Sequence, residues 1–244
     1  VTYCPLCLSS SVYQGQRDST DTFSFGVSGK IWNSNTLLFD KSSHSLWSQL
    51  SGEALVGPRT GARLERVSSQ VMTWSAFKAH YPSGEVLSRS TGIVRDYTQD
   101  PYERQGYYRS FALWYPLNHE DDRVQAKELV YGVEFADAKK AYLETDIKHS
   151  GFIQDTIGSH SVLLVWDPDE QTIRLFSRQQ GDSVLEFEAS EGFLKEKETG
   201  TLWNVQGEAV QGTLKGQRLQ SEVGQSSFWF CWASQHPETD LYSN

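Results

Sequence analysis

Short runs of apolar or alternating residues, separated by turn residues, dominate the chain and predict a mainly β-strand protein. In the second half, the clearest predicted strands are residues 161–166, 172–176 and 184–187. The segment Asp167-Pro168-Asp169-Glu170 is a typical turn between the first two of these strands.

The first half shows the same kind of pattern. Residues 21–27 alternate apolar with small or polar residues, and a turn is predicted at Ser28-Gly29. Residues 36–40 form a second short strand. Residues 52–67 place glycines and a proline between brief apolar stretches, as in hairpins or bulged strands.

One helix is predicted in each half. Residues 73–80 place Trp74 and Phe77 three positions apart on one face, and Pro82 follows as a stop signal. The same spacing returns at Trp229, Trp232 and Pro237. Two aromatic side chains packing on a sheet explain this pattern without a ligand.

Identical residues recur between the halves at one constant offset. The matched pairs are Gly52 with Gly207, Gly57 with Gly212, Trp74 with Trp229, and Pro82 with Pro237. A repeat of this length predicts a duplicated fold. We therefore predict an α+β protein, mostly β, with two related β-rich halves that each carry one short helix. The predicted parts are residues 1–90, a packed connector over 91–122, and a second, degenerate half over 123–244.

The repeat also predicts that the first half lacks its beginning. In the second half, residues 123–160 precede the counterpart of Cys4, whereas only Val1 to Tyr3 precede Cys4 itself. These three residues are expected to be the end of a strand, by analogy with residues 162–166. A missing N-terminal segment or a protein partner is therefore expected to contact this chain.

Composition narrows the class of partner. A hydrophobic fraction of 38% and an aromatic fraction of 13% are typical of a globular chain. A net charge of −9 argues against nucleic acid as the main partner. The sequence also has no apolar stretch long enough to be a transmembrane segment.

The motif Cys4-Pro5-Leu6-Cys7 is the strongest chemical signal in the chain. Its counterpart in the second half is Asp167-Pro168-Asp169-Glu170, whose residues suit a solvated turn. A dithiol kept in one copy of a duplicated fold indicates a chemical role. We therefore expect the two sulfur atoms within bonding or co-chelating distance, facing a polar pocket.

Three interpretations of this dithiol remain open. The spacing allows both sulfur atoms to bind one metal ion, to form a small disulfide ring, or to serve only structure. A zinc ribbon needs a second such pair, and a thioredoxin-like site needs a helix directly after the motif. Residues 8–13 are instead typical of a turn and a strand. Cys231 lies in an aromatic stretch and is expected to be buried and unpaired.

Histidines are the candidates to complete a metal site. His44 lies in the half that holds the dithiol, and His149 lies upstream of the degenerate motif. Thiolate and imidazole ligands together favour copper or zinc, and otherwise no cofactor is predicted. His80 and His236 lie at predicted helix ends and are expected to be solvated. No motif or carboxylate spacing identifies a catalytic residue, so the sequence does not decide whether the chain is an enzyme.

Several motifs together resemble the domain of unknown function 3179 family. They are Val1 to Cys7, Phe25 to Gly29, Asn33-Ser34, Ser45 to Gln49, Gly52 to Leu64, and the segment Arg95-Asp96-Tyr97 with Asp100-Pro101-Tyr102. The resemblance covers most of the chain and adds polar candidate residues from these motifs: Ser28, Asn33, Gln49, Arg95, Asp96 and Asp100. Members usually carry Asn-Trp-His-Glu before the Cys motif. The resemblance implies that His149 is what remains of this segment in the second half.

The family resemblance implies an extracytoplasmic location, because members often follow an export or lipoprotein signal. It carries no established activity. Our first hypothesis is a secreted, periplasmic or lipid-anchored protein that binds a metal or performs thiol redox chemistry through the C-x-x-C motif. The alternative is a non-catalytic binding or interaction module, such as a carbohydrate-binding one, in which Cys4 and Cys7 are structural.

Overall fold

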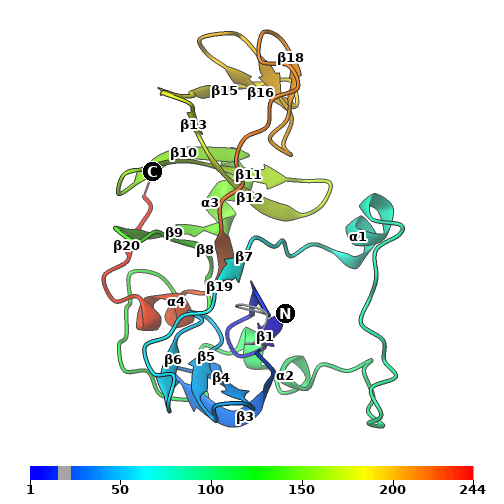
Figure 1. Cartoon of the computed structure of the whole chain (residues 1–244), viewed down its shortest axis with the longest axis vertical. Coiled ribbons are helices and arrows are strands. Elements are labelled where there is room, and N and C mark those ends of the chain that lie inside the picture. The colour runs from blue at the N-terminus through cyan, green and yellow to red at the C-terminus, as the bar shows by residue number, and fades with distance from the viewer. Residues whose placement is uncertain (16–22, 244) are drawn as a thin grey trace.

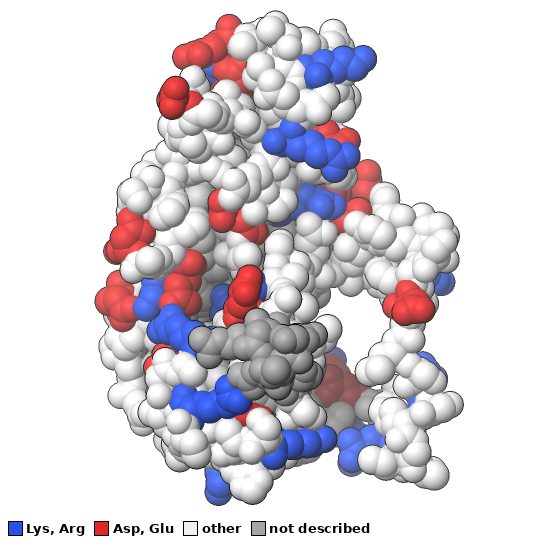
Figure 2. All heavy atoms as spheres, viewed as in Figure 1, with Lys and Arg blue, Asp and Glu red and all other residues white. Residues whose placement is uncertain are grey.

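A computed structural model describes residues 1–15 and 23–243 and shows a mainly β fold built from several small sheets (Figure 1). The expected fold class, α+β with mostly β-structure, is confirmed. Among the described residues, no helix is long and apolar enough to cross a membrane. On the face drawn in Figure 2, acidic and basic groups are interspersed.

The described residues of the first half form two sheets. The sheet that carries the Cys motif has the order β1-β2-β7, formed by β1 (Thr2–Cys4), β2 (Ser9–Tyr13) and β7 (Arg66–Val67). The other is the meander β3 (Phe25–Trp32), β4 (Asn35–Asp40), β5 (Leu46–Ser48) and β6 (Ala54–Val56). The predicted strand at the start of the chain is confirmed, since Thr2 to Cys4 pair antiparallel with β2.

The second half contains four sheets. One has the order β19-β8-β9-β20, with β19 (Gly224–Phe228), β8 (Leu129–Glu134), β9 (Lys139–Leu143) and β20 (Asp240–Leu241). Another is β10 (Phe152–Ile157), β11 (His160–Asp167) and β12 (Thr172–Ser177). The remaining sheets are the pair β13 (Gln179–Gln180) and β14 (Ser183–Val184), and the meander β15 (Phe187–Ser190), β16 (Phe193–Glu196), β17 (Leu202–Trp203) and β18 (Ala209–Gln211).

Both predicted helices are present, as α1 (Trp74–His80) and α4 (Trp229–Gln235). The prediction of one helix per half is wrong for the second half, which also contains α3 (Glu144–Ser150). Its start carries no aromatic pair, and Ile147 is its main apolar anchor, so the helical pattern is weak. The connector holds α2 (Pro101–Arg104) and the short 3-10 helix η1 (Tyr107–Arg109).

The predicted turn at Ser28-Gly29 is wrong. Strand β3 continues through these residues with an irregular register and turns at Asn33-Ser34, where φ is 49° and 54°. Two consecutive residues with positive φ form the turn whose twist suits a two-residue hairpin. Residues 21 and 22 of the expected first strand lie outside the described residues. The expected strand over 184–187 is divided between β14 and β15.

Two matched segments of the halves share detailed geometry. Gly57 and Gly212 have φ of 106° and 105°, and a Cβ at either position would lie within 3 Å of Ser45 or Thr201. The pairing of β5 with β6 and that of β17 with β18 shift register at the same place. Trp47 and Trp203 lie at these shifts and are both fully buried.

Trp74 and Trp229 have different surroundings. Trp229 is fully buried and packs with Val130 of β8 and Ala141 of β9, whereas Trp74 is 55% exposed. Figure 1 shows α1 standing out from the body of the molecule, while α4 lies beneath the sheet of the second half. The shared segments support a duplication, and duplication of the complete halves stays a prediction.

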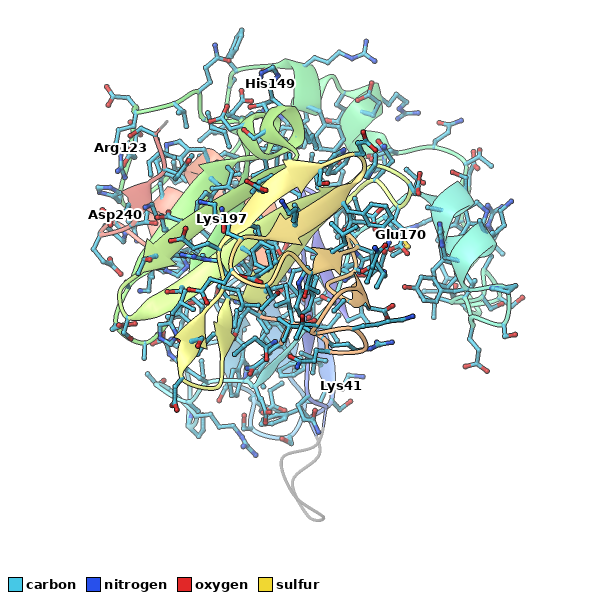
Figure 3. All side chains as sticks on the ribbon, turned by 90° about the horizontal axis from the view of Figure 1, so that it is seen from above. Lys41, Arg123, His149, Glu170, Lys197 and Asp240 are labelled. Atoms are coloured by element: carbon cyan, nitrogen blue, oxygen red, sulfur yellow. A yellow bond between two sulfur atoms is a disulfide. The ribbon has the colours of Figure 1, made fainter. Side chains whose placement is uncertain are left out.

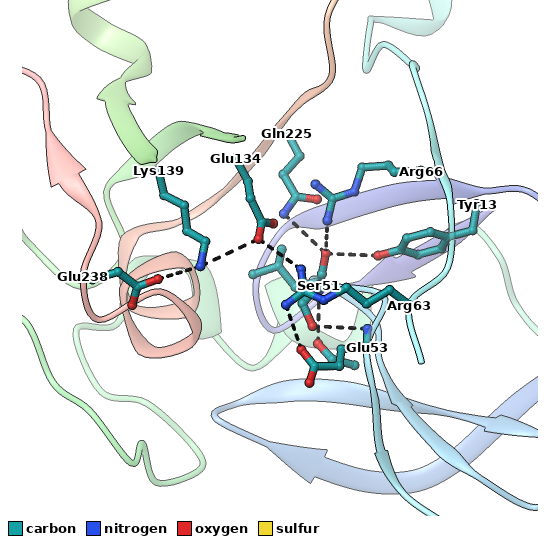
Figure 4. Close-up of polar contacts among 11 residues, drawn as sticks. Tyr13, Ser51, Glu53, Arg63, Arg66, Glu134, Lys139, Gln225 and Glu238 are labelled. Carbon is teal, nitrogen blue, oxygen red and sulfur yellow. Dashed lines mark hydrogen bonds and ion pairs between the residues drawn. The ribbon is translucent and has the colours of Figure 1, made fainter. Parts of the chain in front are cut away.

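Ion pairs connect the two halves directly (Figure 4). Arg63 of the first half contacts Glu53 at 3.1 Å and Glu134 at 3.4 Å. Glu134 also contacts Lys139 at 3.7 Å, which continues the chain of charges to Glu238. The link is specific in geometry, although exposed pairs of this kind each stabilise a fold by less than about 1 kcal/mol.

His236 is buried, so its predicted solvated position is wrong. Its ring lies 4.3 Å from the Trp232 ring, centroid to centroid, and neither ring nitrogen has a partner among the described residues. Burial lowers the pKa of His236 to about 4, because protonation would place an unpaired charge in the core.

This burial predicts a loss of stability in mild acid. The unfolded imidazole takes up a proton near pH 6.5, whereas the folded one stays neutral until about pH 4. The stability that the neutral, buried His236 contributes is therefore fully present above pH 6.5. The free energy of unfolding falls by about 3 kcal/mol as the pH drops to 4. Urea unfolding of the wild type and His236→Phe across this range measures it. The variant should lose less stability than the wild type over the interval, and parallel curves would contradict the assignment.

Candidate functional site

The three cysteines meet in one apolar cluster. Cys4 ends β1, Cys7 lies in the turn to β2, and Cys231 lies on α4. Cys7 and Cys231 form a disulfide with a Cα–Cα distance of 5.8 Å, across 224 positions of sequence. Cys4 is a free buried thiol. The expected burial of Cys231 is confirmed, but its expected unpaired state is wrong.

Tertiary packing brings Cys231 to the turn, and no local pattern could show this. Backbone contacts fix the approach, since the Phe228 amide donates to the Cys7 carbonyl at 2.8 Å. Phe228 and Phe230 then pack into the same cluster as Leu6. The aromatic stretch that led to the prediction of an isolated core cysteine is the surface that docks on the Cys motif.

Cys4 lies among apolar side chains and not in the expected polar pocket. It is fully buried, and its Sγ lies 3.4 Å from the Thr36 hydroxyl. The Cys7 amide contacts the Cys4 carbonyl at 3.3 Å, which closes the turn and keeps the two residues together. A small free thiol thus remains beside an existing disulfide.

Side-chain amides point at the disulfide sulfurs. Asn35 donates from Nδ2 to Cys7 Sγ at 3.4 Å, and Gln235 donates from Nε2 to Cys231 Sγ at 3.8 Å. Asn35 Nδ2 also donates to the side-chain Oε1 of Gln49 at 3.0 Å, and Gln49 is fully buried. N–H donors of this kind stabilise the thiolate form of a sulfur atom.

The connector covers the cysteine turn through Tyr107. This residue is fully buried, and its hydroxyl donates to the Leu6 carbonyl at 2.9 Å. Burial raises the pKa of Tyr107, so the ring stays neutral. Lys127 lies 3.6 Å from the centre of this ring and donates to the Tyr107 carbonyl. Tyr107 thus packs on the cysteine turn, whereas residues 91–101 are exposed, and a packed connector over 91–122 stays a prediction.

The candidate histidines lie elsewhere. His44 is in the turn between β4 and β5, exposed, with its ring stacked on Phe39. His149 is exposed on α3, and Figure 3 shows it at the outer edge of the molecule. Within residues 1–15 and 23–243, no three His, Cys, Asp or Glu side chains are grouped to hold a metal ion. The proposed copper or zinc site therefore gains no support from these histidines.

The other candidate residues divide into two groups. Asn33 is buried and donates to the Ser234 carbonyl at 3.1 Å, so it attaches the hairpin turn to α4. Gln49 lies beside the cysteines, and Ser28 contacts the Leu37 carbonyl within its own hairpin. The connector residues Arg95, Asp96 and Asp100 are exposed, and Asp100 caps α2. The structure thus gathers only Asn33 and Gln49 around the cysteine-bearing elements.

The counterpart turn in the second half is not solvated, contrary to expectation. Asp167 and Glu170 are 0% and 3% exposed, and both contact the buried Arg174, at 3.0 and 2.5 Å. Leu8 and Gln171 follow the two turns with φ of 48° and 55°. The turns are thus alike in backbone, and both point their first and fourth side chains inward.

A groove of about 720 Å³ lies beside the cluster. Phe111, Trp114 and Tyr115 line one part of it, and Phe230, the neighbour of Cys231, lines another. Its acidic edge consists of Glu120, Asp121 and Asp122. Phe230 thus connects this groove to the disulfide on α4.

Fold and site together define a β-rich protein with a buried inter-half disulfide and an adjacent free thiol. The chain belongs to the family described as "Protein of unknown function (DUF3179)", whose model matches residues 1–239. Neither the curated proteins nor the solved structures include a significant match. The resemblance drawn from the sequence motifs is therefore confirmed, and function has to be argued from the site.

Proposed function

We propose that the protein is an extracytoplasmic thiol–disulfide protein that works through Cys4, Cys7 and Cys231. The observation that carries the proposal is a free thiol three residues before one end of a disulfide that joins the two halves. A protein disulfide is stable in oxidising compartments, which agrees with a secreted or periplasmic location.

The proposed reaction is an internal disulfide exchange. The Cys4 thiolate attacks Cys7 Sγ, the Cys4–Cys7 bond forms, and the Cys7–Cys231 bond breaks. The electron pair leaves on Cys231, which takes up the proton that Cys4 gave up. Gln235 is placed to stabilise the leaving thiolate. A partner dithiol then reduces the Cys4–Cys7 disulfide and is itself oxidised to a disulfide.

The free thiol predicts a difference in reduction rate. We expect dithiothreitol to reduce the disulfide of the wild type at least about tenfold faster than that of Cys4→Ser. The reason is that exchange in the wild type moves the bond from Cys7–Cys231 to Cys4–Cys7, on the turn between β1 and β2. Alkylation and peptide mapping at timed intervals measures each thiol. In Cys231→Ser, oxidation should produce the Cys4–Cys7 disulfide.

Matched controls separate redox chemistry from structure. Thr36→Val removes the hydroxyl beside Cys4 without removing a sulfur, so its reduction rate should stay close to wild type. Equal rates in the wild type and Cys4→Ser, with no Cys4–Cys7 disulfide in Cys231→Ser, would reject exchange. That result would assign the cysteines a purely structural role.

Metal binding by the reduced centre is a second candidate function. Three cysteines from separate elements converge in one buried cluster, and thiolates favour copper(I) or zinc. Anaerobic reduction followed by titration with copper(I) should give one bound ion per chain, lost in Cys4→Ser. Binding that persists in this variant would exclude the three-sulfur site.

The aromatic groove is where the alternative function, a binding module, would hold its ligand. Four of the eight Trp side chains are fully buried: Trp47, Trp203, Trp229 and Trp232. These serve the core, whereas Trp114 is 40% exposed and lines the groove. A binding function without redox chemistry would therefore depend on Trp114 and be unaffected by Cys4→Ser.

A further inference from the structure

We propose that the first half contains an open docking slot for a two-stranded β-hairpin of the β8–β9 kind. The slot is formed by residues 69–73, helix α1 and residues 85–87, whose side chains are mostly exposed. The inference is independent of the cysteine chemistry, because it rests on the second half, where the equivalent slot is occupied.

The occupied slot shows which elements belong together. In the second half, the sheet order β19-β8-β9-β20 places the hairpin β8–β9 between two outer strands. Strand β19 pairs antiparallel with β8, and Asp240 and Leu241 of β20 pair parallel with β9. Helix α4 packs its Trp229 and Trp232 against the same hairpin.

The first half has helix α1 and two flanking segments that match the outer elements at the constant offset. Helices α1 and α4 both have seven residues and end alike, since the amide of Tyr81 donates to Phe77, as that of His236 does to Trp232. The next turn also matches, with Gly84 donating to Tyr81 as Thr239 donates to His236. Residues 69–73 therefore correspond to β19, and Glu85-Val86 correspond to β20.

The two halves differ in the central pair of strands, which is β8–β9 in the second half. Residues 69–73 and 85–87 have no strand assigned, whereas their counterparts are both paired. Val86 and Leu87 are 60% and 94% exposed, while their counterparts Leu241 and Tyr242 pack against residues of the hairpin sheet. We infer that these two segments add to the sheet as strands when a hairpin supplies main-chain hydrogen bonds between them.

Exposed apolar side chains are concentrated in the slot and in the residues on either side of it. Half of the exposed large hydrophobic residues of the described chain lie between 67 and 97: Val67, Val71, Trp74, Tyr81, Val86, Leu87, Ile93, Val94 and Tyr97. Between 222 and 243, no described large hydrophobic residue is exposed. Figure 2 shows that the lobe carrying α1 is mostly uncharged on the visible face. Concentrated apolar exposure of this kind marks an interaction site.

The occupied slot also specifies the occupant. Gly132 of β8 lies against Trp232, and a Cβ there would come within 2.3 Å of the indole ring. Phe77 takes the place of Trp232 in the first half. The docked hairpin therefore needs a glycine or similarly small residue opposite Phe77, with apolar residues such as Val130 and Ala141 flanking it on the inner face.

The test supplies the hairpin in cis. A copy of residues 124–157 is fused ahead of Val1 through a glycine–serine linker, which raises its effective concentration at the slot. Hydrogen exchange at residues 69–80 should slow by at least about tenfold relative to the unfused chain. The control fusion carries Gly132→Val in the added copy and should leave exchange as fast as in the unfused chain.

Two results would overturn the proposal. Equal exchange in both fusions, whether fast or slow, would show that no specific hairpin docks. Slow exchange at residues 69–80 in the unfused chain that depends on protein concentration would assign the slot to a second copy. Trp74→Ala with Phe77→Ala in the first fusion provides a further check, because it should restore fast exchange without altering α4.

Discussion

Trp229→Ala is expected to lower the free energy of unfolding by about 3–5 kcal/mol, whereas Trp74→Ala should change it by no more than about 0.5 kcal/mol. The two residues hold equivalent positions on α4 and α1. Trp229 is fully buried and donates from Nε1 to the Asp121 carbonyl at 3.0 Å. Removing it leaves a cavity and an unpaired carbonyl.

Trp74 makes few contacts in this chain, so its removal has a small effect on stability. Its ring stacks on Phe77, and Lys78 lies over it, but more than half of its surface is exposed. Urea unfolding, followed by circular dichroism for both variants, measures the difference. Similar losses for the two variants would contradict the described environment of α1 and would remove the basis of the open slot.

Arg174→Met is the second change with a large expected effect, a loss of about 3–5 kcal/mol. Its guanidinium is the cation that contacts the buried Asp167 and Glu170, so the substitution leaves two carboxylates in the core without it. Adding Asp167→Asn and Glu170→Gln to Arg174→Met should recover much of the loss, because no charge is then left unpaired.

Arg218→Met is the matched control for this ion-pair substitution. Arg218 pairs with Glu208, but its side chain is 76% exposed, so solvent screens the interaction. We expect a loss of about 1 kcal/mol or less for this variant. Equal losses for Arg174→Met and Arg218→Met would mean that the acidic turn is solvated, as the sequence had suggested. Thermal unfolding at neutral pH distinguishes the cases.

The sequence predicted those elements that depend on short stretches of neighbouring residues. The strands β11 and β12, the start of β1 and the two aromatic helices follow from apolar runs, turn residues and spacing. The hairpin turn was misplaced from Asn33-Ser34 to Ser28-Gly29 because glycine is the commoner residue at positive φ. Non-glycine residues in that conformation give a weaker sequence signal.

The candidate site was predicted only in part. Cys4 and Cys7 were identified from their spacing, and Gln49 from family motifs. The role of Cys231 was missed, as were those of Asn35 and Tyr107, because each acts through contacts with residues distant in sequence. His44 and His149 were chosen for ligand chemistry and for their positions relative to the Cys motif and its counterpart, and the fold leaves both exposed.

The sequence by itself determined the β-rich class, the family, the matched segments at a constant offset and the presence of a dithiol motif. These depend on residue type, order and spacing, which a chain displays without folding. The tertiary structure decided which cysteines are joined, which acidic residues are buried and which of two similar helices is covered. Those outcomes depend on long-range packing, because Cys231 reaches Cys7 and β8–β9 reaches α4 only when distant segments bury their apolar surfaces together.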